Sequence, residues 1–180
     1  MGVCLPATCM IDADCGAMGP FADLLASTPR LTTDEAKSEL RAAFSAWEAV
    51  AGVKFTEVSE PHLANIIIGT TIASGGRAFA NLSLGGKLAT ASVAKALGAA
   101  SNPSTSRGAS VVTDGPVVAI EQAYICANPK VGWKAGFDGN LDVYDLRYTF
   151  MHEIGHAIGL DHPGSSGSIM GYRYDERVRE

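Results

Sequence analysis

The sequence predicts a single α+β domain in which one long helix packs against a sheet and a second helix carries the candidate functional residues. Three observations predict this fold class. Apolar residues recur at helical spacing before residue 50, two short runs at 53–58 and 64–69 are strand-like, and a second helical pattern begins at Leu146. A chain of 180 residues is long enough to bury one core, so residues 1–180 are expected to form one domain.

The amino-acid composition indicates a globular protein and excludes two classes of binding partner. Hydrophobic residues make up 47% of the chain and charged residues 18%, which is typical of a globular protein. The net charge is −5 and the basic residues form no cluster, so neither nucleic acid nor an anionic membrane is an expected partner. No apolar run is long enough to span a bilayer, and the N-terminus lacks the charged and apolar regions of a signal peptide. We expect a monomer.

The long helix is predicted from a start signal, an apolar face and a stop signal. Thr32 and Glu35 form a capping box, in which each side chain accepts a hydrogen bond from the other residue's backbone N–H. Gly52 ends the helix. The apolar residues at helical spacing are Ala36, Leu40, Ala43, Phe44 and Trp47. We expect this face to pack against the sheet.

Residues 1–30 are expected to form an irregular, cysteine-rich segment. Cysteines stand at positions 4, 9 and 15, and a fourth stands at 126. In an oxidising compartment an even number of cysteines favours two disulfides, for which three pairings are possible. We favour Cys4–Cys9 with Cys15–Cys126.

Two other regions are expected to be loops. Residues 83–110 form an insertion rich in Ala, Ser and Gly, with a short helix predicted at 88–99. Residues 137–142 carry carboxylates at calcium-like spacing, which makes Ca²⁺ a second candidate cofactor, yet the segment is too short for an EF-hand loop. A turn is favoured there, because Asp-Gly and Gly-Asn are typical of turns.

Residues 152–162 read His-Glu-Ile-Gly-His-Ala-Ile-Gly-Leu-Asp-His and match the pattern H-E-x-x-H-x-x-G-x-x-H. On a helix that Asp145 caps, His152 and His156 leave the same face one turn apart. Gly159 lets the chain turn out of the helix, because glycine adopts positive φ at little cost. His162 can then supply a third nitrogen to one metal ion.

These residues together predict a catalytic zinc site. Three neutral imidazoles and one open position are typical of catalytic zinc, whereas structural zinc sites are usually closed by four protein ligands. Glu153 lies beside the first histidine, where its carboxylate can reach the attacking water and act as general base.

The histidine motif followed by Ser168-Ile169-Met170-Gly171-Tyr172 resembles the metzincin clan of zinc endopeptidases. In that clan a tight Met-turn places a methionine beneath the zinc, and Met170 would be that residue. The short spacing from His162 to Met170 resembles the matrixins, as do residues 43–47, 53–58 and 64–68. Pro163 and Tyr172 instead resemble the serralysins, which use a tyrosine as an extra zinc ligand. Tyr172 either plays that part or packs near the site.

The resemblance implies a matrixin-like catalytic domain with serralysin-like features. Its fold would be a twisted mixed sheet with a long backing helix, an active-site helix and a short C-terminal subdomain. Its activity would be that of a zinc endopeptidase with Glu153 as general base, assisted by Tyr172. Such proteases are normally secreted, so an extracellular location is expected. An extended polypeptide would bind along an edge strand, unless this is an ordinary edge strand; its residues are Ala78, Phe79, Ala80 and Asn81.

The sequence departs from the matrixin pattern in three places. No histidine lies between His62 and His152, so the family's second, structural zinc site is predicted to be missing. The Pro-Arg-Cys-Gly type of sequence that keeps matrixin zymogens latent is absent, which favours structural disulfides over a cysteine switch. The family closes its domain with a helix after the Met-turn, whereas this sequence ends at Glu180; either the chain is truncated or the wall of the cleft is unusually open.

A second hypothesis belongs to a different functional class. The chain could be a zinc-containing module that binds peptides without cutting them, or a latent or inactive protease homologue. The short C-terminal region supports this hypothesis, because an incomplete cleft would orient a substrate poorly. Glu153 argues against it, because a protein that only binds peptides needs no general base.

Overall fold

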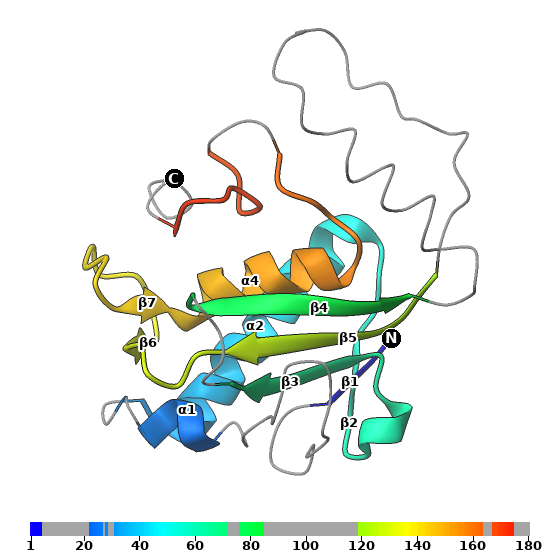
Figure 1. The fold of residues 1–180 in the computed structure, drawn as a ribbon, viewed down its shortest axis with the longest axis horizontal. Coiled ribbons are helices and arrows are strands. Elements are labelled where there is room, and N and C mark those ends of the chain that lie inside the picture. Colours follow the sequence, from blue (N-terminus) through cyan, green and yellow to red (C-terminus); the bar gives the residue numbers. More distant parts are fainter. Residues whose placement is uncertain are drawn as a thin grey trace, which may run out of the picture.

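The structure is a computed structural model that describes residues 1–4, 22–26, 28, 31–71, 76–84, 119–163 and 167–174. A five-stranded sheet forms one layer of the fold (Figure 1). Its strands are β1 (Gly2–Cys4), β2 (Thr56–Val58), β3 (Ile66–Thr70), β4 (Ala78–Leu84) and β5 (Ile120–Ala127). In the order β2-β1-β3-β5-β4, every neighbouring pair is parallel except β4 with β5, which is antiparallel. The predicted mixed sheet is confirmed, and β4 is one of its edges.

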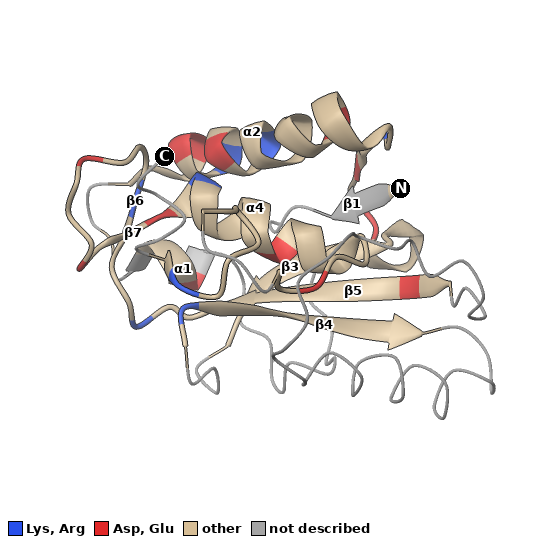
Figure 2. Ribbon diagram, turned by 90° about the horizontal axis from the view of Figure 1, so that it is seen from above, with Lys and Arg blue, Asp and Glu red and all other residues tan. Residues whose placement is uncertain are grey.

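Two long helices, α2 (Thr33–Ala51) and α4 (Leu146–Ala157), form the second layer. Viewed from above, α4 lies between α2 and the strands β4 and β5 (Figure 2). A hydrogen bond joins the two helices, because Trp47 Nε1 donates to the Met151 carbonyl at 2.8 Å. The predicted backing helix and active-site helix are therefore both confirmed.

The core lies between the sheet and the two helices, and the strands alternate as their pleat requires. From β3 and β5, Ile66, Ile68 and Ile125 join the core with the buried face of α2. Tyr124 and Cys126 belong to a smaller cluster on the other face. The buried residues of α2 are the predicted ones, namely Ala36, Leu40, Ala43, Phe44 and Trp47.

Cys126 is fully buried and disulfide-bonded. The side chains of the other three cysteines lie outside the part of the chain that the structure describes, so the pairings Cys4–Cys9 and Cys15–Cys126 stay a prediction.

Helix α2 begins with the predicted capping box. The backbone N–H of Thr32 donates to Glu35 Oε2 at 2.9 Å, and the backbone N–H of Glu35 donates to Thr32 Oγ1 at 3.2 Å. The helix ends at Gly52, whose φ of 65° is left-handed and suits glycine.

Replacing Thr32 with alanine should lower the free energy of unfolding by about 1 kcal/mol, because an N–H of the first helical turn loses its acceptor. Urea denaturation measures this difference. The matched control is Thr33→Ala, since Thr33 is also exposed but is the first residue inside the helix. Equal losses from the two substitutions would contradict the capping role.

The structure differs from the predictions near the N-terminus and before β2. Gly2–Cys4 pairs with both β2 and β3, and α1 spans Ala22–Ala26, so the prediction of an irregular segment over 1–30 is wrong at these residues. Residues 53–55 are not a strand. Instead the Phe55 ring packs against Phe44 at 4.9 Å, and the Phe55 N–H donates to Glu48 Oε1 at 2.7 Å. Most of the predicted insertion at 83–110, with its helix at 88–99, lies outside the described residues.

A second, two-stranded sheet precedes α4. It pairs β6 (Trp133–Lys134) in parallel with β7 (Tyr144–Asp145). In the intervening loop Asp138 Oδ1 accepts from the Lys134 ammonium group and from the Asn140 N–H, and hydrogen bonding to Lys134 lowers the pKa of Asp138. These bonds are typical of the predicted turn; the calcium prediction stays untested.

A short 3-10 helix, η1 (Pro61–Leu63), lies between β2 and β3. No helix in the described part of the chain is long and apolar enough to cross a membrane.

Candidate metal centre

Helix α4 carries the first two histidines of the motif, and its N-terminus is fixed by Asp145. Asp145 caps it as predicted, with Oδ1 accepting from the Tyr148 N–H at 2.8 Å. Asp145 is buried, and burial raises the pKa of its carboxyl group, while the hydrogen bond from Tyr148 acts in the opposite direction. Its own N–H donates to the Tyr174 hydroxyl at 2.6 Å, so the start of α4 is tied to the chain that follows the motif.

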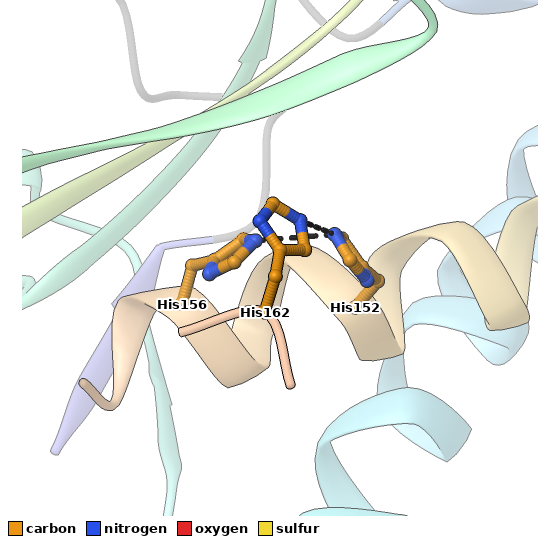
Figure 3. A group of neighbouring side chains, drawn as sticks. All are labelled: His152, His156 and His162. Atoms are coloured by element: carbon orange, nitrogen blue, oxygen red, sulfur yellow. Dashed lines mark hydrogen bonds between the residues drawn. The ribbon is translucent and has the colours of Figure 1, made fainter. Parts of the chain in front are cut away.

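The three predicted histidines converge (Figure 3). His152 Nε2 lies 3.1 Å from His156 Nε2 and 3.1 Å from His162 Nε2. Two nitrogens bound to one tetrahedral zinc at about 2.05 Å would stand roughly 3.3 Å apart. The three side chains therefore fit a single zinc ion.

The opposite ring nitrogens fix the orientation of two of these imidazoles. His152 Nδ1 lies 2.8 Å from the Ile169 carbonyl oxygen, and His156 Nδ1 lies 2.7 Å from that of Leu160. A carbonyl only accepts, so each Nδ1 carries the proton and the ring's lone pair is on Nε2. This is the tautomer and orientation that a metal ligand needs.

The turn after α4 brings the third histidine back. Gly159 has φ of 98°, a left-handed conformation that L-residues with a side chain rarely adopt. The Gly159 N–H donates to His156 O at 2.9 Å, and the Leu160 N–H donates to Gly155 O at 2.9 Å, which closes the helix end. The predicted role of Gly159 thus has a direct conformational reason.

Met170 lies beneath the helix that carries the ligands. It is buried and lies within a turn that is closed by the Gly171 N–H, which donates to Ser168 O at 2.7 Å. A methyl group placed on Gly155 would lie only 2.2 Å from Met170 Sδ and 3.0 Å from Trp47 Cζ2. The missing side chain at Gly155 is what allows the sulfur to pack against α4.

A cleft of about 360 Å³ lies above these residues. The motif lines one wall, including Glu153, which is 6% exposed. Edge strand β4 lines the other wall with Ala78, Phe79 and Ala80, whereas Asn81 is not among the lining residues. The structure thus brings the three predicted histidine ligands, Glu153 and three of the four predicted strand residues to one cleft.

Tyr172 also lines this cleft. Its ring centroid lies 5.4 Å from that of His162 in an edge-on contact, and the side chain is 78% exposed. Its role as an extra zinc ligand stays a prediction.

Arg77 and Thr149 line the same cleft and were not predicted as site residues. Thr149 stands four residues before Glu153, so helical spacing could have placed it on the same face. Arg77 directly precedes the predicted strand segment, but nothing in its local sequence indicates a binding role.

The sheet, the two helices and the converging imidazoles define an α+β domain in which three histidines are placed to hold one metal ion. The family model described as Matrixin matches residues 22–180, and the chain belongs to the matrixin family. This confirms the predicted matrixin-like metzincin; the serralysin-like features are not confirmed. The family implies zinc as the metal and a peptide as the substrate class. No curated protein matches the chain.

Proposed function

We propose that this protein is a zinc-dependent endopeptidase that hydrolyses internal bonds of an extended polypeptide. The observation that carries the proposal is the convergence of three histidine Nε2 atoms in a cleft that also contains the Glu153 carboxylate. A site that only held a metal for stability would be closed by a fourth protein ligand. Among the described residues the metal-binding cluster has three members.

Each residue of the site is proposed to have a separate role in peptide-bond hydrolysis. Zinc, when bound, supplies a Lewis acid and lowers the pKa of a water molecule to about 7. Glu153 accepts a proton from the attacking water and passes it to the nitrogen of the leaving amine. Tyr172, exposed beside His162, is proposed to stabilise the developing oxyanion.

Edge strand β4 is proposed to hold the substrate. Among the described strands its neighbour is β5 alone, and an added substrate strand would pair with backbone N–H and C=O groups along the opposite side of β4. Ala78 and Ala80 are small, which allows a peptide backbone to approach the wall closely. This pairing would lay the scissile bond across the cleft above Glu153.

We also propose that the protein is secreted and monomeric. The disulfide at Cys126 supports an extracellular location, because disulfides persist in oxidising compartments and are rare in the cytosol.

Cleavage of a quenched fluorescent peptide should require zinc. A chelator should abolish cleavage, and added Zn²⁺ should restore it. His156→Ala should remove most of the bound zinc together with the activity, whereas His62→Ala should change neither, because His62 is exposed on η1 and is not a ligand.

Fluorescence anisotropy of the same peptides, measured in parallel, distinguishes a protease from a module that only binds peptides. Binding of peptides by the zinc-loaded protein without any cleavage would contradict the protease proposal and support a peptide-binding module.

A further inference from the structure

Two buried polar side-chain atoms lack a hydrogen-bond partner in the described part of the chain, and both belong to residues that line the cleft. They are Arg77 Nη1 and Thr149 Oγ1. Thr149 is 2% exposed and lies one helical turn before Glu153. Buried polar groups are nearly always paired, because an unpaired one loses its hydration without compensation. Two unpaired groups in one cleft therefore point to a ligand that supplies their partners.

The guanidinium group of Arg77 is held in place by aromatic rings. Its Cζ lies 4.9 Å from the centre of the Tyr144 ring and 5.1 Å from that of Tyr174. These two rings meet edge-on at 5.2 Å. Stacking of this kind restricts the side chain and leaves its N–H donors available in the plane of the group. No described carboxylate forms an ion pair with Arg77, in contrast to Arg41 and Arg147.

The cleft extends towards a second arginine. Arg77 and Tyr172 also line an adjoining hollow of about 240 Å³, whose other residues include Arg173 and Tyr174. Two arginine residues thus line this end of the cleft, although the chain as a whole carries a net charge of −5. The local charge favours an anionic group on the ligand.

We propose that Arg77 and Thr149 form a subsite that binds a carboxylate group of the peptide. This inference rests on the proposed function and adds the substrate class to it. A carboxylate matches the planar donors of arginine and can also accept from the threonine hydroxyl. The carboxylate belongs either to an aspartate or glutamate near the scissile bond or to the C-terminus of the peptide.

The test uses pairs of quenched peptides that differ only by Glu or Gln at one position, from two residues before the scissile bond to two residues after it. A further pair ends in a free carboxylate or an amide. Wild-type protein should prefer the carboxylate peptide by about tenfold or more in kcat/KM, because the neutral analogue leaves the Arg77 guanidinium group without a charged partner. A preference for Glu identifies a side chain, whereas a preference for the free acid identifies the C-terminus.

Arg77→Met should reduce this preference to nearly one, and Arg77→Lys should retain part of it because the charge remains without the planar donors. Thr149→Val provides a second variant of similar shape and should weaken the preference several-fold. The matched control is Arg41→Met, which removes an exposed arginine paired with Glu57 and should leave the preference unchanged. Zinc content is measured for every variant.

Two results would overturn the subsite. One is equal cleavage of all Glu and Gln pairs and of the free-acid and amide pair by the wild type. The other is a preference that survives in Arg77→Met. If no peptide is cut, the proposed function fails, but anisotropy still compares the affinities of the zinc-loaded protein for the same pairs. A carboxylate preference in Kd that Arg77→Met abolishes would then support the subsite alone, and its absence would reject it.

Discussion

Glu153→Gln is expected to lower kcat by about 10²–10⁴-fold while the protein keeps one zinc ion. Glutamine has nearly the shape of glutamate, so the cleft and the three histidines should be undisturbed. It cannot accept the proton of the attacking water, so the carboxylate's contribution to the rate is lost. Peptide hydrolysis and metal analysis of the same preparation measure the two quantities.

The matched control is Glu121→Gln, because Glu121 is exposed on β5 and does not line the cleft. It removes the same charge and should change kcat little. Turnover of Glu153→Gln close to that of the wild type would show that the general base is a different group. Loss of zinc from this variant would instead show that the carboxylate stabilises the metal site.

Both long helices could be predicted because their signals are local. Thr32 and Glu35 start α2, and Gly52 stops it. Asp145 starts α4, and the four-residue spacing of the first two histidines follows from the helical period. The position of Met170 under the site could be predicted only from the resemblance to metzincins, because no local sequence pattern indicates that it packs against Gly155.

The parts that could not be predicted depend on contacts between distant segments. β1 is a strand only because β2 and β3 flank it, and three residues carry too little pattern to indicate this. The Arg77 guanidinium group lies against Tyr144 and Tyr174, which stand 67 and 97 residues later in the sequence. A subsite assembled from a helix residue and the residue before an edge strand has no signature along the chain.

The segment after the motif, residues 167–174, supports the metal site from below. The Ile169 carbonyl orients His152 at 2.8 Å, and the Tyr174 hydroxyl accepts from the Asp145 N–H at 2.6 Å. Between them, Met170 packs against the backbone of α4 at Gly155. Both ends of the helix segment that carries Glu153 are thus connected to one short stretch of chain. A displacement of Met170 should therefore also shift the histidine side chains that bind zinc.

Gly155→Ala is expected to lower the free energy of unfolding by about 1–3 kcal/mol, as overpacking in a core usually does. The added methyl group would lie 2.2 Å from Met170 Sδ, so the methionine must move. In an ordinary helix interior the same substitution stabilises by about 1 kcal/mol, so the sign of the effect separates crowding from helix propensity. Because Met170 follows the residue that orients His152, zinc affinity should fall by about 10–100-fold.

A double-mutant cycle with Met170→Ala tests the cause of this loss. Met170→Ala alone should cost about 2–5 kcal/mol, because it leaves a cavity. In that background the main obstacle to the new methyl group is gone, so adding Gly155→Ala should be neutral or stabilising, with only Trp47 Cζ2 left at 3.0 Å. Urea denaturation gives the four free energies of unfolding. If Gly155→Ala costs the same with and without Met170, the contact between sulfur and glycine does not explain the loss. The support of the zinc ligands would then rest on the Ile169 carbonyl and Tyr174.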